Sequence, residues 1–589
     1  MSKLNGAPID FTTFHNIIDG QPRGSGNIHH GINPSSGKPL WDVPIASQHD
    51  LDDAVKAAQR GFETWSKFSW EERQVVIGKM YDEFMKYESE LGGIIRLEGG
   101  KPMPFCNMEA AGAANVLKFY TTQPPMEDEI ISDDANLRLT MRHIPLGVVG
   151  AICPWNFPLI IPMNKVGPAL LTGSCIIIKP SPFTPYGVLK VVEIMQRFLP
   201  PGVLQAVNGD ASMGPLMTEH PGIDKISFTG SSATGKRVMA SAAKTLKRVT
   251  LELGGNSAAI ICPDVDPAKI APKVALGAFY NSGQLCVASK RLYVHRDIYQ
   301  EMLKALSDVV TGWKTGPSTE DGVMLGPVQN EMQHQIVKGY FEDCASNGYE
   351  FAVPGSIEKT DGFVIQPAIV QNPPDSARIV REEQFGPIVP MMVWDTEDDL
   401  IARVNDTDTG LGGAVYCADL DRAQRIAHRI EAGTIWINSN EIPRTEAYFC
   451  GHKESGLGGE GGRQGLFEYM NTQVTHLYKG DVGKDSKLSD NTNLTLRYID
   501  DSLEEVVTSL RLQLRSHRIT GMEGEEREAL ETDDSRAAAN VYVTRRRGFA
   551  NFAPPLAPAS NPSPLFPRHP PLAFSVRGEK SIDDIQTRA

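Results

Sequence analysis

Four short apolar segments, each followed by a stretch long enough for a helix, most constrain the fold of this chain. They are VVGAI (148–152), CIIIK (175–179), LQAV (204–207) and KISFT (225–229). Strand and helix alternating in this way predict a parallel sheet with helices on both faces, and a second alternation over roughly 255–450 predicts a second α/β lobe. Ligands bind such sheets at the carboxyl ends of the strands, so the polar residues after these segments are candidates for a functional site.

The long apolar zone from Leu146 to Ile178 could instead suggest a membrane span. Proline, glycine, asparagine and lysine interrupt it, so it never reaches about 20 consecutive apolar residues. Buried parallel strands explain it better. The N-terminal segment lacks the basic and apolar regions of a secretory signal, and we expect a cytoplasmic protein.

Charge and cysteine content argue against several classes of function. The formal net charge of −14 disfavours nucleic acid and anionic membranes as partners, because both attract clustered lysine and arginine. The eight cysteines form no CxxC pair and no Cys/His cluster with zinc spacing. We therefore expect no metal site and no disulfide framework, with the thiols reduced.

The two ends of the chain differ from its middle. Ser47 to Asp50 resembles a capping box, and apolar residues at helical spacing follow it. Beyond about residue 480 the chain is linker-like, then charged, and Pro554 to Pro571 holds eight prolines in 18 residues. We predict that most of 484–589 is disordered or loosely helical. An artefact of the gene model would explain this end as well as a functional tail would.

Cys286, within NSGQLCVASKR (281–291), is the first candidate for chemistry. A lone cysteine is usually a small buried hydrophobe, but Gly283 frees the backbone here, and polar residues precede Cys286 where a core strand would be apolar. A cysteine nucleophile must be a thiolate, which needs a nearby dipole or a general base. No histidine lies within eight residues, which weighs mildly against a Cys-His pair.

Glu252 and Asn156 are two further polar residues that follow apolar strands. Glu252 precedes Gly-Gly, and such a turn can present its carboxylate to a cleft, although a solvated strand end is an equal alternative. Asn156 lies in CPWNFPL (153–159), where its amide could donate to a developing oxyanion. A simple turn asparagine is the competing interpretation.

The segment FTGSSATG (228–235) follows a strand and opens a helix. Gly230, Ser231 and Gly235 in this arrangement resemble a turn whose backbone N–H groups face a phosphate at a helix N-terminus. The pattern is neither GxGxxG nor a P-loop, so a plain glycine-rich connection remains an alternative.

Together these segments resemble the NAD(P)-dependent aldehyde dehydrogenase superfamily, over a region from about Asn16 to Lys479. The motifs that carry the resemblance, in family order and spacing, are PWNFPL, IKPS, FTGSSATG, LELGGNS, NSGQLC, EEQFGP and GHKESGLG. The resemblance implies oxidation of an aldehyde to a carboxylic acid, with NAD or NADP as cofactor and NAD slightly favoured. It names no particular aldehyde.

The resemblance also implies a role for each matching residue. Cys286 matches the nucleophile that forms a thiohemiacetal and then a thioester, and Asn156 matches the side chain that holds the oxyanion. Glu252 matches the general base for thioester hydrolysis, and Lys165 with Glu460 matches a proton-relay pair behind it. The cofactor-binding positions implied by the resemblance are Trp155, Lys179, Gly230, Ser231, Gly235, Glu383 and Phe385.

The fold implied is α/β, of aldehyde-dehydrogenase type. A Rossmann-like cofactor domain would comprise 1–122 and 146–254, and a second α/β catalytic domain would comprise 255–453. A β arm for oligomerisation with a C-terminal segment would comprise 123–145 and 454–483. A projecting arm would leave strand edges unpaired without a partner, so we expect a homodimer or homotetramer.

Three positions depart from the family pattern. Pro182 stands where many NAD-preferring members carry a glutamate for the adenosine ribose, which leaves the cofactor preference open. Asn164 stands where many members have an aromatic residue in the aldehyde tunnel, which suggests a more polar or larger substrate. Cys450, in AYFCGHK, replaces a common glycine.

Two rival functions remain at this point. One is a catalytically silent relative that acts as a structural or binding protein, and it need not keep Cys286, Glu252 and Asn156 together. The other is a cysteine hydrolase or esterase with the same thiol, which would make no use of Lys179 or the phosphate turn.

Overall fold

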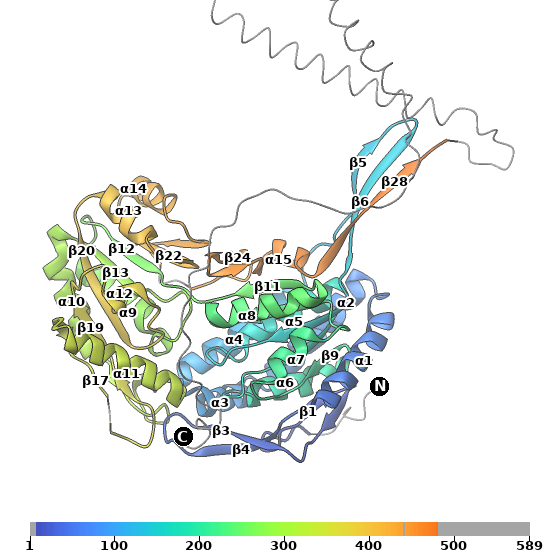
Figure 1. Cartoon of the computed structure of the whole chain (residues 1–589), viewed down its shortest axis with the longest axis horizontal. Coiled ribbons are helices and arrows are strands. Elements are labelled where there is room, and N and C mark those ends of the chain that lie inside the picture. Colours follow the sequence, from blue (N-terminus) through green and yellow to red (C-terminus); the bar gives the residue numbers. More distant parts are fainter. Residues whose placement is uncertain (1–7, 358, 440–441, 481–589) are drawn as a thin grey trace, which may run out of the picture. The chain divides into compact units, whose positions relative to one another are not determined.

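The computed structural model of the chain describes residues 8–357, 359–439 and 442–480. The predicted disordered tail over 484–589 lies outside the described residues. Within them, the two predicted α/β regions are present, and each is built on its own sheet (Figure 1). No helix in the described part of the chain is long and apolar enough to cross a membrane.

The first sheet contains the four predicted strands and confirms them. Its order is β2-β1-β9-β8-β7-β10-β11-β26. The bounds are β1 (Asn16–Ile18), β2 (Gln21–Arg23), β7 (Val148–Ile152), β8 (Cys175–Lys179), β9 (Leu204–Ala206), β10 (Lys225–Thr229), β11 (Arg248–Glu252) and β26 (Gly456–Leu457). The run from β9 to β11 is parallel throughout, so the carboxyl ends of these strands lie at one edge of the sheet.

Helices enclose this sheet in two layers. Those that pack directly on the strands are α1 (Gln48–Trp65), α5 (Ile160–Thr172), α6 (Tyr186–Met195), α7 (Met213–Glu219) and α8 (Ser232–Ala242). An outer layer on α5 and α6 comprises α2 (Trp70–Lys86), α3 (Glu88–Gly99) and α4 (Met103–Tyr120). The predicted capping box is confirmed: the Asp50 backbone N–H donates to the Ser47 hydroxyl at 3.2 Å, and the Ser47 N–H donates to the Asp50 carboxylate at 2.8 Å.

The second sheet has the order β16-β19-β20-β13-β12-β22-β23. Its strands are β12 (Ala258–Ile261), β13 (Arg291–His295), β16 (Phe351–Val353), β19 (Ala368–Gln371), β20 (Ile388–Trp394), β22 (Gly412–Tyr416) and β23 (Thr434–Ile437). The helices around it are α9 (Pro267–Phe279), α10 (Tyr299–Thr311), α11 (Glu331–Ser346), α12 (Arg378–Arg381), α13 (Glu397–Asn405) and α14 (Leu420–Ala427).

Both faces of the second sheet are buried, which explains why its strands are apolar at consecutive positions. Ile260 and Val415 pack with residues of α11 to α14. The next residues along the same strands, Ile261 and Tyr416, pack with α9 and α10 on the opposite face. Alternating side chains of a strand point to opposite faces, so a sheet covered on both sides requires this continuous pattern.

A three-stranded antiparallel sheet, in the order β28-β6-β5, extends away from the first sheet (Figure 1). It comprises β5 (Glu129–Asp133), β6 (Leu137–Pro145) and β28 (Met470–Tyr478), and we call it the arm. The other short elements are β3 (Ile28–Ile32), β4 (Pro39–Pro44), β14 (Lys314–Thr315), β15 (Val323–Leu325), β17 (Ser356–Ile357), β18 (Ile365–Gln366), β21 (Thr409–Gly410), β24 (Phe449–Cys450), β25 (His452–Lys453), β27 (Gly459–Glu460) and α15 (Gln464–Phe467).

Candidate active site

Glu252 is the last residue of β11, at the carboxyl edge of the first sheet. It is only 4% exposed, and among the described residues neither carboxylate oxygen has a hydrogen-bond partner. Burial raises the pKa of this carboxyl well above its usual value, and the charge of Glu460 raises it further, while Lys165 acts in the opposite direction. A buried carboxyl with free oxygens and a raised pKa is suited to taking a proton near neutral pH.

Cys286 follows an unusual turn at the end of α9. Asn281, Ser282 and Gly283 have φ values of 52°, 55° and 74°, so three consecutive residues adopt the left-handed conformation. This conformation is costly for residues with a Cβ, and such strain concentrates at functional sites. The Gly283 position is enforced, because a Cβ there would lie 2.2 Å from the Gly386 carbonyl oxygen.

Cys286 is half-buried, in contrast to six of the eight cysteines, which are buried. Its surroundings are nevertheless dense: burial raises its pKa to about 12, the charges of Glu383 and Glu252 add to this, and the Lys290 charge opposes it. The resting side chain is therefore a neutral thiol, and a neighbouring group must accept its proton before it can act as a nucleophile.

The Gly-Gly pair after Glu252 allows the two sheets to meet at this point. A Cβ on Gly255 would lie 2.5 Å from the Cys286 carbonyl oxygen, and one on Gly254 would lie 2.4 Å from a carboxylate oxygen of Glu383. Glycine is thus required at position 255, where the close atom belongs to the backbone, whereas the contact at position 254 is with the end of the flexible Glu383 side chain. The structure thereby brings together Glu252, Cys286 and Glu383, which are far apart in the sequence.

Asn156 lies in the loop that follows β7, next to the nucleophile segment. Its side-chain N–H donates to the Gln284 carbonyl at 3.1 Å, and the Asn281 side chain donates to the Asn156 carbonyl at 3.2 Å. These bonds hold the Asn156 side chain against Gln284, which lies two residues before Cys286 in the chain. A primary amide has two N–H donors, so the second can serve an oxyanion.

Lys165, on α5, contacts Glu460, on β27, directly: its Nζ donates to Glu460 Oε1. The same Nζ donates to the hydroxyls of Ser227 at 3.0 Å and Thr229 at 2.8 Å. Both charged side chains are buried, at 0% and 5% exposure. The predicted pair is thus assembled behind Glu252.

Lys179 and Ser231 lie at the carboxyl ends of β8 and β10. Lys179 is buried, and its Nζ donates to the carbonyl of the adjacent Pro180 at 3.1 Å. Burial lowers its pKa to about 8, with Asp210 among the groups that oppose this shift. Ser231 is the N-cap of α8 and accepts a hydrogen bond from the Thr234 N–H.

Glu383 and Phe385 lie in the loop before β20. A Glu383 carboxylate oxygen accepts the Gly255 N–H at 3.3 Å, and burial raises the Glu383 pKa to about 7, with the Lys290 charge opposing the rise. Phe385 has a φ of 49° and packs edge-on to Trp155, with ring centroids 5.4 Å apart. The predicted cofactor residues on the two lobes therefore meet.

Lys290 is a site residue that the sequence patterns do not identify. It is 1% exposed; its Nζ donates to the Gly283 carbonyl at 2.6 Å and lies 4.9 Å from the centroid of the Phe385 ring. Burial lowers its pKa to about 8, and the charges of Glu383 and Cys286 oppose that shift. The sequence signal that could have identified it is the pair Lys290-Arg291 directly before the apolar residues LYV, because a charged pair next to a buried strand indicates buried, functional charges.

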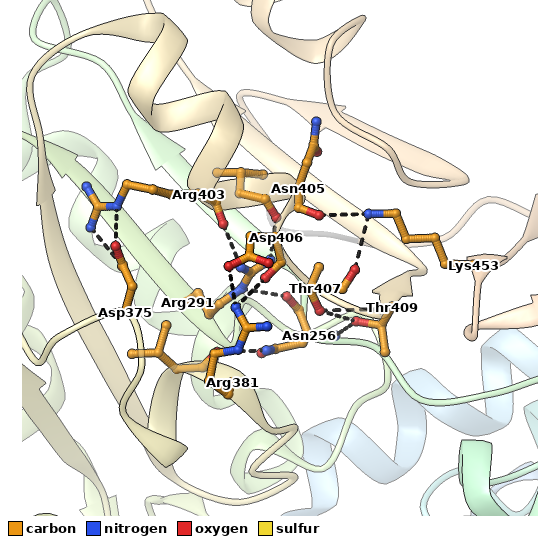
Figure 2. A network of polar contacts seen from close by, with 12 residues as sticks. Asn256, Arg291, Asp375, Arg381, Arg403, Asn405, Asp406, Thr407, Thr409 and Lys453 are labelled. Carbon is orange, nitrogen blue, oxygen red and sulfur yellow. Dashed lines mark hydrogen bonds and ion pairs between the residues drawn. The ribbon is translucent and has the colours of Figure 1, made fainter.

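Arg291, the next residue, anchors the nucleophile segment to the second lobe (Figure 2). Its guanidinium donates to the carbonyls of Asn256 at 2.9 Å and Val404 at 2.9 Å. Asn256 in turn donates its N–H to Thr409 at 3.0 Å. This network ties Arg291, the first residue of β13, and Asn256, four residues after Glu252, to each other and to α13 and β21.

The three departures from the family pattern occupy distinct places. The Pro182 carbonyl lies 3.0 Å from a ring nitrogen of His29 on β3. Asn164 is half-buried on α5, beside Lys165. Cys450 is half-buried on β24; burial raises its pKa, and the charge of Glu252 adds to the rise.

Comparison with known families and proteins gives one consistent result. The model of the aldehyde dehydrogenase family matches residues 23–475. Aldehyde dehydrogenase LUC3 of a Fusarium species is 40% identical over 473 residues, which cover 80% of this chain and 100% of that protein. The mitochondrial succinate-semialdehyde dehydrogenase of Arabidopsis thaliana is 35% identical over 457 residues, covering 77% and 86% of the two chains.

Solved structures give the same result. An aldehyde dehydrogenase of Bacillus cereus in complex with NAD+ has a TM-score of 0.77 and 32% identity, covering 79% of this chain and 97% of that one. An NADP-dependent enzyme of E. coli has a TM-score of 0.78 and 31% identity, covering 80% and 98%. One of these two structures is described with NAD and the other with NADP.

Proposed function

The chain belongs to the aldehyde dehydrogenase family, and we propose that Cys286 and Glu252 are its nucleophile and general base. As a member of this family it is an oxidoreductase that acts on small aldehydes with NAD or NADP. The observation that carries the proposal is the close approach of Glu252, Cys286 and Asn156 at the point where the two sheets meet. The three side chains come from the end of β11, the loop after β7 and the segment after α9, and each has the chemistry that acyl transfer through a thioester requires.

The residues around this point fit a nicotinamide cofactor. Lys179 is a buried cation whose Nζ donates to the carbonyl of the adjacent Pro180, and its remaining N–H groups suit it to hold hydroxyl or phosphate oxygens. The N-terminus of α8, an 11-residue helix capped by Ser231 between Gly230 and Gly235, suits a pyrophosphate. Glu383, Phe385 and Trp155 would hold the nicotinamide end. When bound, the cofactor would accept the hydride that a thiohemiacetal loses on becoming a thioester.

The first stage of the proposed mechanism is activation of Cys286. Its thiol proton passes to a neighbouring base, and the thiolate attacks the aldehyde carbon, so that one C–S bond forms and the carbonyl π electrons move to oxygen. The second N–H of the Asn156 amide and the Cys286 backbone N–H stabilise this oxyanion. Such a donor typically contributes about 3 kcal/mol.

The second stage is hydrolysis of the thioester by water. Glu252 takes one proton from the attacking water, the new C–O bond forms, and the C–S bond breaks to leave a carboxylic acid and the Cys286 thiolate. The buried carboxyl must lose its proton before the next turnover. The Lys165–Glu460 pair behind it is placed to receive that proton.

The two rival functions are not favoured by the site. A silent relative has no need of a buried, unpaired general base beside a strained nucleophile turn. A hydrolase has no need of the buried Lys179 or of the Glu383 loop that contacts the Gly254–Gly255 turn.

We also propose which segments of the chain bind the cofactor, carry the nucleophile and mediate oligomerisation. Segments 1–122 and 146–254 would bind the cofactor, 255–453 would carry the nucleophile, and 123–145 with 454–483 would mediate oligomerisation. The arm supports the last role because it exposes large apolar side chains, Ile130 at 51% and Leu477 at 54%, which a homodimer or homotetramer would cover. The eight free cysteines accord with a cytoplasmic location.

The direct experiment is to record absorbance at the band of the reduced nicotinamide with a panel of aldehydes and each cofactor. We expect reduced cofactor to accumulate in proportion to carboxylic acid. Ester hydrolysis without any reduced cofactor would favour the hydrolase, and no reaction with either class of substrate would favour the silent relative. The panel should include polar aldehydes, because Asn164 predicts a polar or large substrate.

A further inference from the structure

One face of β10 (Lys225–Thr229) carries polar side chains inside an otherwise apolar sheet. Lys225, Ser227 and Thr229 are the alternate residues of this strand, so their side chains point to the same face. Lys225 and Ser227 are both 0% exposed. A central parallel strand is normally apolar on both faces, and three polar residues in register therefore require an explanation.

The neighbouring strand β11 continues the same polar face. In the parallel ladder Thr229 lies opposite Glu252, and Ser227 lies opposite Thr250, which is also buried. Paired residues on adjacent strands present their side chains to the same face. A row of polar side chains thus begins beside Glu252 and ends at Lys225. The four residue steps from Thr229 to Lys225 span about 13 Å of strand.

The inner half of this row meets the Lys165–Glu460 pair. Lys165 Nζ donates to Thr229 at 2.8 Å and to Ser227 at 3.0 Å, and the Ser227 hydroxyl lies 3.4 Å from a Glu460 oxygen. Each hydroxyl can donate one proton and accept another. The inner half is therefore a connected set of Lys165, Glu460, Ser227 and Thr229, and Thr229 is the strand partner of Glu252.

The outer half leads to the surface through Glu468. Lys225 Nζ donates to the Thr250 hydroxyl at 2.5 Å, and that hydroxyl donates to a Glu468 oxygen at 3.1 Å. The other Glu468 oxygen accepts the Tyr448 hydroxyl at 3.0 Å. The Glu468 side chain is 25% exposed, whereas the Lys225 side chain is 0% exposed, so Glu468 is the point of contact with water.

We propose that Thr250, Lys225 and Glu468 form the outer part of a proton route that connects the general base Glu252 to solvent. The inference rests on the function proposed above. During each turnover Glu252 removes one proton from the hydrolytic water, and this proton must leave before the carboxylate can act again. It passes through the Lys165–Glu460 pair and the hydroxyls of β10 and β11 to Lys225, and Glu468 releases it to water.

A merely structural role accounts less well for the outer residues. Replacing a buried ion pair by well-packed apolar residues is often neutral or stabilising, so packing alone gives no reason to bury Lys225 beside Lys165. Burial also lowers the Lys225 pKa to about 7; the Glu468 and Glu460 carboxylates oppose this shift, and the Lys165 and Arg248 cations add to it. An amine that exchanges its proton near neutral pH can both accept and pass on a proton.

The test uses Thr250→Val and Glu468→Gln, which keep side-chain shape, with Lys225→Met as a third variant. A matched control removes an exposed pair of the same kind, Lys244 with Glu219, by Lys244→Met and Glu219→Gln. The burst of reduced cofactor, steady-state turnover in weakly buffered H₂O and D₂O, and proton release to a pH indicator are measured with one aldehyde.

We expect an unchanged burst in every variant, because the route acts after thioester formation. Steady-state turnover should fall by about tenfold or more in the route variants, since a positioned acid–base group typically contributes at least that factor. Their solvent isotope effect should increase, and a small buffer such as imidazole should restore turnover. The exposed-pair control should match the wild type in all three measurements.

Wild-type turnover and isotope effect in both Thr250→Val and Glu468→Gln would overturn the route. A fall in turnover that no buffer restores, with the isotope effect of the wild type, would also overturn it, because that result indicates altered packing. A wild-type protein that reduces neither cofactor with any aldehyde would instead refute the proposed function.

Discussion

Replacing Glu252 by glutamine should separate the two stages of the reaction. The amide has the shape of the carboxyl but cannot take a proton from water. Both Glu252 oxygens lack hydrogen-bond partners among the described residues, so the substitution breaks no bond seen there. We expect thioester formation to continue and its hydrolysis to become rate-limiting.

The magnitude follows from the role of the buried carboxyl. A positioned general base typically contributes about 10²- to 10⁴-fold, and each tenfold corresponds to about 1.4 kcal/mol of activation free energy. Steady-state turnover should fall by a factor in this range. The sign of the pH dependence is also fixed: burial raises the Glu252 pKa, so the wild-type carboxyl is protonated in acid and its hydrolysis rate rises as the proton is lost. Glu252→Gln should lose this rise.

The assay is stopped-flow absorbance of the reduced cofactor, which resolves a burst from the steady rate. Glu252→Gln should show a burst close to one equivalent per active subunit, then very slow turnover. Glu219→Gln, an exposed carboxyl on α7, is the matched control and should behave as the wild type. A wild-type steady rate in Glu252→Gln would refute the assignment, and Glu460 would become the candidate base.

Three further predictions concern other parts of the site and fold. Lys290→Met should raise the Cys286 pKa by about one unit, because it removes a nearby cation, and alkylation of the thiol at pH 8 should slow by about tenfold. Pro182→Glu should shift the ratio of kcat/KM values towards NAD by about 1–2 kcal/mol at constant ionic strength; an unchanged ratio would place the adenosine ribose elsewhere. Lys101→Met strips the fully buried Glu109 of its ion-pair partner and should lower the free energy of unfolding in urea by about 3–5 kcal/mol, whereas Lys304→Met, at an exposed pair, should cost less than about 1 kcal/mol.

The sequence predicts well the elements whose signal is local. The segments at 148–152 and 175–178 are continuously apolar because both faces of the sheet are covered, and the structure confirms both strands. The helix after Ser47 begins where the capping box predicts, because both partners of that motif lie within four residues. The position of Glu252 at the end of a strand follows from the apolar run before it.

The features that were missed depend on contacts between distant segments. Lys290 is buried because the Gly283 carbonyl and the Phe385 ring enclose it, and neither contact leaves a periodic signal. The left-handed conformation of Asn281 and Ser282 likewise accompanies contacts with distant segments, since their side chains donate to the carbonyls of Asn156 and Gly326. Alternating polar residues in KISFT were visible in the sequence, but their meaning depends on the register with β11, which only the fold supplies.

The central claim is that the aldehyde becomes covalently attached to Cys286 as an acyl group. The most direct measurement is peptide mass spectrometry of Glu252→Gln, quenched during turnover with an aldehyde and cofactor. The account predicts an adduct equal to the aldehyde minus two hydrogens on the peptide that contains Cys286, in an amount equal to the burst of reduced cofactor. Accumulation of reduced cofactor with no adduct, or with the adduct on another of the eight cysteines, would contradict it.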